Sequence, residues 1–386
     1  MMIFFYKLNT FILMNIAFVG NYEENAVNGV VVSAYMQAKI LVSLGHKVYF
    51  YFRSPRAFIE TNKDNITKRG FEGQTFFTFL PNIYRFLQQN PDEIDIFHIH
   101  SVFIPLNKLF AFCFKRLHYK YVITPHGGYD PNILQRDWLK KQVYYFFFEK
   151  SLISNANAIF CVAEKEKLSI EKLSYKGLIF TIPNPIDVEN DWIDSTHYTD
   201  SQSLQEQHIV YMGRYDMQHK GLDALLKIFK VIEEKQVNLS LHLYGTGEDL
   251  VNLKCMIQDL QLRKVFIHNP AFGEEKLHIF QNATAYIQNS RWEAFGISIF
   301  EAASAGLPLI VSEGVYMKDF ISRHDIGIVL ENNIDKAVDQ IIKFCADTDK
   351  LKEISHRIRG VVENHLSARV VGKLLEHAYS EVMNKS

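Results

Sequence analysis

The sequence predicts an α/β protein of two doubly wound domains, each with a parallel sheet covered by helices on both faces. Short apolar, β-rich runs alternate with longer runs of helical periodicity along most of the chain. This alternation stops once, over residues 188–206, which are acidic and rich in Ser, Thr and Asp. The length of 386 residues also suits two domains of ordinary size.

The first half of the chain shows the βαβ pattern of a parallel sheet. We expect a buried strand at residues 15–20, a helix at 30–44 that Gly45 ends, and a strand at 47–53. Strands and helices then continue to alternate at residues 94–100, 103–116, 121–124, 138–155, 158–162 and 178–182. This spacing is typical of a sheet that is buried on both faces.

The pattern restarts after the polar segment, with a strand at residues 208–214. Helices are expected near residues 221–234, 249–260 and 297–306, and the tail from about 351 to 383 is expected to be helical throughout. The further predicted strands are residues 239–244, 265–268, 283–288, 307–312 and 327–330. Two such domains place a cleft between the carboxyl ends of their sheets, where ligands of these folds bind.

These patterns divide the chain into a dispensable N-terminal extension, two Rossmann-like domains with a linker between them, and a closing helix that crosses back to the first domain. A clean strand begins after Met14, which is why the residues before it are expected to be dispensable. The five segments are residues 1–13, 14–190, 191–206, 207–365 and 366–386.

Charge and composition exclude several classes of protein. A net charge of −1 argues against a general nucleic-acid binder, which would carry a strong basic excess. The sum hides an asymmetry, because residues 1–190 carry a net charge of +5 and the remainder −6. No run reaches the roughly 18 uninterrupted apolar residues of a membrane span. No two of the four cysteines form a CxxC motif, which favours reduced cysteines in a cytosolic protein.

The most specific motif lies in residues 290–312 and contains two glutamates with seven residues between them. Glu293 is expected on a loop after a strand, and Glu301 inside the helix that Gly296 opens. Glycine there lets a ligand approach the backbone N–H groups at the positive end of a helix, which favours a phosphate. A carboxylate on the helix can accept hydrogen bonds from a vicinal diol such as that of ribose. The apolar neighbours of Glu301 count against the alternative of a solvated helix with unrelated acids.

A second motif lies in residues 211–226. A strand is expected to end at Gly213 and Arg214, and Lys220 and Gly221 are expected to start the following helix. Two cations at the carboxyl end of a strand can neutralise a pyrophosphate leaving group. Ordinary surface charge would explain this motif equally well on its own, but less well beside the two glutamates.

Together these motifs resemble the family 4 glycosyltransferases of the GT-B fold, in which two Rossmann-like domains face each other across a cleft. The resemblance rests on GR…KG, on E-x7-E and on the A-G-x-P-x-I-x-S that follows it. It covers about residues 14–385, and E-x7-E is its specific part. In the first domain the agreements are NGV at 28–30, LVSLGHKV at 41–48, DIFHIHS at 95–101, TPHGG at 124–128 and IPNPID at 182–187.

The resemblance implies a retaining transfer, of the hexosyltransferase type, from a nucleotide-sugar donor, without a cofactor or a metal. The implied acceptor is a glycan or a lipid-linked molecule, and the implied role is bacterial surface polysaccharide or lipopolysaccharide biosynthesis. We expect a cytoplasmic protein that binds no nucleic acid, with a peripheral site on the inner face of the cytoplasmic membrane as a further possibility.

By position in the family pattern, Arg214 and Lys220 would hold the diphosphate and Glu301 the ribose hydroxyls. Glu293 would contact the donor sugar, and His126 would face that sugar from the first domain. The candidate catalytic residues are therefore His126, Arg214, Lys220 and Glu293. The remaining candidate donor-binding residues are Gly29, which would approach the phosphates, and Gly213, Phe295, Gly296 and Ile297. An oxocarbenium-like transition state needs neutralisation of the leaving diphosphate and positioning more than strong base chemistry.

Three positions depart from the family pattern. Asn28 replaces the first glycine of the usual GGV loop, Ala294 stands where glycine is common, and Pro185 follows Asn184 in place of glycine. Of these, Asn28 bears most on the donor site, because it changes the loop that would approach the phosphates.

Several other functions account for part of the sequence pattern. A glycoside hydrolase would also use two carboxylates, but nothing indicates a barrel. A nicotinamide-dependent oxidoreductase would need GxGxxG after the first strand, where the sequence is GNYEENAVNG. A non-catalytic GT-B subunit that partners an active enzyme, and a sugar-nucleotide epimerase of the same fold, stay open as alternatives.

Two features of the first domain also have two interpretations. His98 and His100 could form half of a metal site, but hydrogen-bonded residues near a strand end are favoured because no third ligand is evident. The runs at residues 109–121 and 138–150 mix aromatic and basic side chains. They either pack on the sheet with basic outer faces, which is favoured, or contact an anionic membrane.

Overall fold

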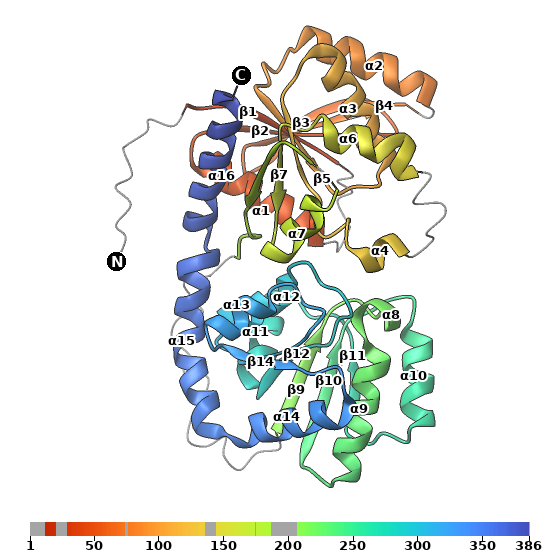
Figure 1. The fold of residues 1–386 in the computed structure, drawn as a ribbon, viewed down its shortest axis with the longest axis vertical. Helices are drawn as coiled ribbons and strands as arrows, with labels where there is room; N and C mark the ends of the chain where they lie inside the picture. Colours follow the sequence, from red (N-terminus) through yellow and green to blue (C-terminus); the bar gives the residue numbers. More distant parts are fainter. Residues whose placement is uncertain are drawn as a thin grey trace. The chain divides into compact units, whose positions relative to one another are not determined.

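The computed structural model describes residues 12–20, 29–73, 76–135, 144–173, 175–186 and 207–385. The chain forms two compact units, one of residues 1–185 with 368–386 and the other of residues 186–367 (Figure 1). Each unit is built on a largely parallel sheet with helices packed on it, which confirms the predicted fold class. Most of the expected extension, the expected linker at 191–206 and Asn28 lie outside the described residues.

The first unit contains an eight-stranded sheet in the order β3-β4-β2-β1-β5-β6-β7-β8. Neighbouring strands are parallel except for β3, which is antiparallel to β4. The strands are β1 (Asn15–Val19), β2 (Lys47–Ser54), β3 (Phe58–Thr61), β4 (Ile66–Glu72), β5 (Ile96–His100), β6 (Tyr121–Thr124), β7 (Ala158–Cys161) and β8 (Leu178–Thr181).

The sheet of the first unit has a hydrophobic core on each face. Along β1, Ala17 and Val19 belong to one core and Ile16 and Phe18 to the other, as expected for alternating side chains in a sheet buried on both faces. The helices are α1 (Gly29–Ser43), α2 (Phe76–Gln89), α3 (Pro105–Leu117), α4 (Pro131–Gln135), the π-helix η1 (Tyr145–Glu149), α6 (Lys150–Ser154), α7 (Glu164–Glu171) and α16 (Ala368–Asn384).

The second unit contains a parallel sheet in the order β11-β10-β9-β12-β13-β14. Its strands are β9 (Gln207–Met212), β10 (Leu239–Tyr244), β11 (Val265–His268), β12 (Ala285–Gln288), β13 (Leu309–Ser312) and β14 (Gly327–Leu330). Its helices are α8 (Met217–Lys220), α9 (Leu222–Glu234), α10 (Leu250–Asp259), α11 (Gly273–Asn282), α12 (Ile297–Ser304), α13 (Lys318–Arg323), α14 (Ile334–Ala346) and α15 (Thr348–Leu366).

The tail is helical, as predicted, except at Ser367, which divides it into two helices. Ser367 has an extended backbone (φ −64°, ψ 157°), so α15 ends before it and α16 starts after it. The Ile186 N–H donates to the Leu366 carbonyl (2.8 Å), which holds the chain at this break. Within the first unit, α16 packs against α1 and contributes Tyr379 to the core (Figure 1).

The helix expected at residues 138–155 is described from residue 144, where η1 and α6 form its second part. The hairpin of β3 and β4 and the helix α2 were not predicted from the sequence. No helix in the described ranges combines the length and the apolar character that crossing a bilayer requires.

Candidate active site

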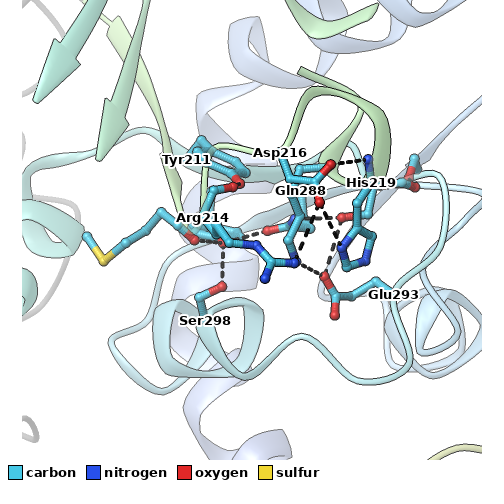
Figure 2. Close-up of polar contacts among 12 residues, drawn as sticks. Tyr211, Arg214, Asp216, His219, Gln288, Glu293 and Ser298 are labelled. Carbon is cyan, nitrogen blue, oxygen red and sulfur yellow. Dashed lines mark hydrogen bonds and ion pairs between the residues drawn. The ribbon is translucent and has the colours of Figure 1, made fainter. Parts of the chain in front are cut away.

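Arg214 lies on the turn that directly follows β9. The Gly213 N–H donates to the Tyr244 carbonyl at the end of β10 (3.0 Å). The Tyr211 hydroxyl donates to the Arg214 carbonyl (2.8 Å), and both residues are labelled in Figure 2. These bonds fix the main chain of the turn. The Arg214 side chain is 66% exposed and makes a 3.6 Å contact with Asp216. An exposed guanidinium at the carboxyl end of a strand is suited to binding an anion.

Lys220 is the last residue of the short helix α8. Asp216 caps this helix by accepting a hydrogen bond from the His219 N–H (2.8 Å). Gly221 then adopts the left-handed backbone conformation (φ 62°), and α9 begins after it. The helix start predicted at Lys220 and Gly221 thus agrees with the structure to within two residues, and α8 is a further short helix before it.

Lys220 and Glu293 form an ion pair in which the lysine Nζ donates to Oε2 of the glutamate. Their side chains are only 15% and 14% exposed. Burial alone would raise the pKa of Glu293, but the cation of Lys220, the nearby His219 and hydrogen bonds from Lys220 and Ser290 lower it overall. Burial and the charge of Lys220 lower the pKa of His219. At neutral pH the site therefore holds an ionised glutamate beside a neutral imidazole.

Two neighbouring residues hold the loop of Glu293 against α8. The Arg291 guanidinium donates to two main-chain carbonyls of α8 (2.9 and 3.0 Å) and to the Asp223 carboxylate (2.7 Å). The Trp292 ring stacks on the His219 ring, with their centroids 4.8 Å apart. Sequence reasoning missed both roles, because they depend on contacts between segments about 70 positions apart.

A row of buried polar groups connects Glu293 with the first turn of α12. Ser290 Oγ donates to Glu293 Oε2 (3.4 Å), and Gln288 Nε2 donates to Ser290 Oγ (2.7 Å). The Tyr286 hydroxyl lies 2.9 Å from Gln288 Oε1 and 2.8 Å from Ser298 Oγ (Figure 2). Tyr286, Gln288 and Ser290 are spaced two residues apart, in β12 and just after it, so their side chains lie on one face of the sheet. This spacing is visible in the sequence.

The helix α12 begins where the sequence predicts. Gly296 has φ 75°, which a residue with a Cβ adopts only with strain. The Phe295 ring is buried and packs on Phe300, with centroids 4.8 Å apart, so only the main chain of Phe295 can take part in a ligand contact. The main chain of Gly296 and Ile297 lies at the positive end of the helix dipole, where an anion is favoured.

Glu301 lies inside α12, as predicted, and forms an ion pair with Lys276 of α11 (2.7 Å). Lys276 was not predicted as part of the site. The two residues are 25 positions apart in different helices, so no local pattern indicates the contact. The pair fixes one oxygen of the carboxylate that the family pattern assigns to the ribose.

In the first unit, His126 lies on the turn after β6 in the left-handed conformation (φ 53°). Its Nε2 lies 3.1 Å from Nδ1 of His100. Burial lowers the pKa of His126 to about 3, so the imidazole is neutral at physiological pH. A neutral imidazole can donate or accept a hydrogen bond but carries no charge with which to bind a phosphate.

Glu166, which sequence reasoning missed, holds the turn of His126 in place. This buried carboxylate of α7 accepts hydrogen bonds from the N–H groups of Gly127 and Val162. Burial raises the pKa of Glu166 to about 7, although both N–H groups act to lower it. The carboxylate therefore connects the turn after β6 with the start of α7.

His98 is hydrogen-bonded inside the first unit, in agreement with the favoured interpretation. Its ring nitrogens lie 2.6 Å from the Tyr379 hydroxyl and 2.7 Å from Thr124 Oγ1. Both His98 and His100 are buried on β5. Within the part of the chain that the structure describes, no group of three or more His, Cys, Asp or Glu side chains has an arrangement that could hold a metal ion.

The second unit contains eight of the ten residues that the sequence singled out, and the first unit contains His126 and Gly29, the first residue of α1. The structure pairs Lys220 directly with Glu293. It does not pair Glu301 with any other predicted residue, because Lys276 occupies that contact.

Two family descriptions match the chain. Glycosyltransferase Family 4 matches residues 27–190, and Glycosyl transferases group 1 matches residues 199–361. The chain belongs to the family 4 glycosyltransferases. The resemblance seen in the sequence motifs is thus confirmed. The two matched regions are separated by residues 191–198, which lie inside the polar segment.

Among curated proteins, the chain is 23% identical over 245 residues to the uncharacterized glycosyltransferase YqgM of Bacillus subtilis, a match over 63% of this chain and 66% of YqgM. It is also 23% identical over 261 residues to CapM of Staphylococcus aureus, a capsular polysaccharide biosynthesis glycosyltransferase, over 64% of this chain and 67% of CapM. The match thus spans about two thirds of the length of these relatives.

Solved structures confirm the GT-B fold. Sucrose-phosphate synthase from Thermosynechococcus elongatus superposes with a TM-score of 0.76 at 15% identity, over 97% of this chain and 100% of that protein. Anabaena HepE, solved in complex with UDP and glucose, superposes with a TM-score of 0.73 at 15% identity, over 95% and 99% of the two chains.

Proposed function

We propose that this chain is a retaining glycosyltransferase, of the hexosyltransferase type, that moves a sugar from a nucleotide-sugar donor to a glycan or lipid-linked acceptor. One observation carries the proposal. The Lys220–Glu293 ion pair and the exposed Arg214 lie beside the start of α12, after the ends of parallel strands. Family membership and the likeness to HepE, which was solved with UDP and glucose, support it.

Arg214 and Lys220 are the proposed ligands of the donor diphosphate. The Arg214 guanidinium is exposed and offers several N–H donors in a planar fork, which suits phosphate oxygens. The Lys220 ammonium has three N–H donors, so it can keep its bond to Glu293 and still donate to a phosphate. The turn at Gly213 and the main chain of Phe295, Gly296 and Ile297 would complete this subsite.

The two glutamates are the proposed ligands of the hydroxyl groups on either side of the diphosphate. Glu293 is ionised, and Lys220 and Ser290 occupy Oε2, which leaves Oε1 to accept from a sugar hydroxyl. Glu301 would accept from the ribose hydroxyls while Lys276 holds its other oxygen. Gly29 and His126 are proposed donor contacts on the family resemblance, His126 as a neutral hydrogen-bonding group.

In the proposed reaction the bond between the sugar's anomeric carbon and the diphosphate oxygen breaks, and a bond from an acceptor oxygen to that carbon forms. The acceptor hydroxyl gives its proton to the departing diphosphate, which leaves as the nucleoside diphosphate. Charge builds on the departing diphosphate, where Arg214 and Lys220 would stabilise it. The proposal assigns no cofactor and no metal. It needs positioning and charge neutralisation more than a strong base.

The proposed biological role is the synthesis of a bacterial surface polysaccharide or lipopolysaccharide at the cytoplasmic side of the membrane. The likeness to CapM, a capsular polysaccharide biosynthesis glycosyltransferase, supports this role.

A panel of UDP-, GDP-, ADP- and dTDP-sugars tests the donor proposal by thermal stabilisation of the full chain. A donor at about 100 times its Kd stabilises a folded protein by about 2.7 kcal/mol, which is a readily measured shift in Tm. Stabilisation by one nucleotide class supports the proposal, and product analysis then distinguishes transfer from epimerisation. A folded protein that responds to none of the four classes would contradict the proposal.

A further inference from the structure

Four phenylalanine side chains lie exposed on one part of the first unit. Phe146 and Phe147 in η1 are 66% and 65% exposed, and Phe148 in η1 and Phe112 in α3 are exposed as well. Single exposed apolar residues are common, but a group of large aromatic rings on a protein surface indicates an interaction site.

The two elements that carry these rings lie side by side. The Lys108 ammonium in α3 donates to the Phe148 carbonyl, and the Phe103 N–H donates to Oε1 of Glu149 (2.9 Å). Phe112 follows Lys108 by four residues and therefore lies on the same face of α3. The packing of α3 against α6 is visible in Figure 1. The exposed rings thus form one surface, which we call the aromatic patch (Phe112, Phe146, Phe147 and Phe148).

Packing on the sheet does not explain the aromatic patch. Phe110 and Phe114 of α3 are fully buried in the core and provide its contact with the sheet, whereas Phe112 points away from that core. The three successive phenylalanines of η1 occupy different directions around the helix axis, and all three remain exposed. The fold therefore does not need the rings where they are.

Cations surround the aromatic patch. The Arg116 guanidinium lies over the Phe112 ring at 5.8 Å, and the Lys150 ammonium lies over the Phe146 ring at 6.0 Å. Lys108 and Lys115 lie four and three residues from Phe112 in α3, so they belong to the helix face that carries this ring or to its edge. Residues 105–120 contain no acidic side chain.

The only acid within residues 144–155 is Glu149, which is buried. It accepts hydrogen bonds from the Phe103 N–H and the Tyr129 hydroxyl (2.9 Å each). The outer surface of these segments is therefore aromatic and basic, without an exposed carboxylate.

We infer that the aromatic patch and its cations dock the first unit onto an anionic phospholipid bilayer. Aromatic rings enter the boundary between headgroups and acyl chains, while lysine and arginine bind the anionic headgroups above it. A protein partner of ordinary composition would not require that residues 105–120 and 144–155 expose no carboxylate. The inference rests on this surface alone and would place the chain beside the lipid-linked acceptor of the proposed function.

Flotation of the full chain with vesicles tests this inference. Vesicles of phosphatidylcholine mixed equally with phosphatidylglycerol are compared with pure phosphatidylcholine, at about 0.1 M salt. We expect the chain to float with the anionic vesicles only. We expect Phe146→Ser/Phe147→Ser to weaken binding by at least about tenfold through loss of ring insertion, and Lys115→Glu/Arg116→Glu by a similar factor through charge reversal.

Matched controls lie in the second unit. Phe266→Ser/Phe272→Ser removes two exposed rings, and Lys227→Glu/Lys254→Glu reverses two exposed cations. Both control variants should float like the natural chain. All variants change exposed side chains, and stabilisation by the nucleotide-sugar panel shows for each whether the donor site is intact. A failed donor proposal and a failed docking proposal are therefore distinguishable.

Three results would overturn the inference. One is the absence of binding to anionic vesicles by the folded natural chain, and another is unchanged binding by both patch variants. The third is a dimer in solution that Phe146→Ser/Phe147→Ser dissociates, because a second copy of the chain would then be what covers the patch.

Discussion

Both units bury a pair of titratable side chains where parallel strands end. The pair in the second unit is charged, whereas the pair in the first unit is neutral. The second unit pairs Lys220 with an ionised Glu293. The first unit places His100 next to His126, and burial keeps both imidazoles neutral. A buried charge is stable only beside an opposite charge or several hydrogen-bond donors. The second unit is therefore the one built to meet a charged ligand.

The largest expected effect comes from breaking the ion pair. Lys220→Met leaves the carboxylate of Glu293 largely buried without its cation, and we expect the free energy of unfolding of the second unit to fall by about 3 kcal/mol. Urea unfolding, analysed with a separate transition for each unit, measures this loss. Lys220→Met/Glu293→Met removes both charges and should recover most of the stability. A double variant as unstable as the single one would contradict the charge argument.

The next effect concerns Glu166, the buried carboxylate that holds the turn of His126. Glu166→Gln keeps one acceptor oxygen for two N–H donors, those of Gly127 and Val162, so one N–H loses its partner. We expect a loss of about 2 kcal/mol in the first unit. Glu164→Gln, two positions away on the exposed side of α7, is the matched control and should change little. Equal stability of the Glu166→Gln and Glu164→Gln variants would contradict the claim that Glu166 stabilises the first unit.

The titration of Glu166 should make the first unit more stable at low pH than at neutral pH. Its pKa in the folded chain is raised to about 7 from an ordinary value of 4.5, so the folded state holds the proton more tightly than the unfolded state. Its contribution to stability is present below about pH 4.5 and is lost as pH rises towards 7. Glu166→Gln should remove this dependence, which unfolding curves across that range would detect.

Histidines of lowered pKa give stability the opposite dependence on pH, and both units contain them. In the second unit the pKa of His219 is lowered, and burial lowers that of His242 to about 4. The pKa of His126 is lowered to about 3 from 6.5, so the unfolded chain takes up the proton first and the first unit loses stability as pH falls below about 6.5. The slope is about 1.4 kcal/mol per pH unit for each such histidine. The first unit contains three histidines of strongly lowered pKa, His98, His100 and His126, so we expect it to lose more stability on acidification. The lowered pKa of Glu293 adds to the acid sensitivity of the second unit only below 4.5.

Hydrogen exchange read separately in the two units, between about pH 7 and pH 5, tests this difference. We expect protection to fall further in the first unit. His126→Asn should reduce that fall. A first unit that is no more acid-sensitive than the second would contradict the claim that burial keeps His100 and His126 neutral.

The smallest stability effect is expected at Arg214. Its side chain is 66% exposed and its ion contact is 3.6 Å long, so Arg214→Gln should change the free energy of unfolding by less than about 0.5 kcal/mol. Thermal unfolding of the full chain measures it. A loss as large as that of Lys220→Met would mean that Arg214 supports the fold and is not held ready for a ligand.

Much of the fold could be predicted because burial on both faces of a parallel sheet leaves short apolar runs that the sequence shows directly. The hairpin of β3 and β4 was missed, since β3 is an exposed edge strand with little apolar pattern (residues 58–61). The helix α2 was missed as well, and it contains Pro81, which normally argues against a helix interior.

The positions of Glu293 and Glu301 on a loop and inside a helix could be predicted because glycine and helix periodicity are local signals. Their partners could be predicted only in part. Lys220 lies 73 positions from Glu293, and Lys276 comes from a helix that the sequence did not indicate. Contacts of this kind depend on how the sheet brings distant strand ends together.

The central claim is that the charged site of the second unit binds the donor diphosphate, and a calorimetric titration of Arg214→Gln tests it most directly. The ligand is the nucleoside diphosphate of whichever donor class stabilises the natural chain. Because the fold tolerates this change, the account predicts a Kd at least about tenfold higher than that of the natural chain, through loss of charge-assisted hydrogen bonds. Arg263→Gln, which changes another exposed arginine of the same unit, should bind normally. Equal affinity of all three proteins would contradict the claim.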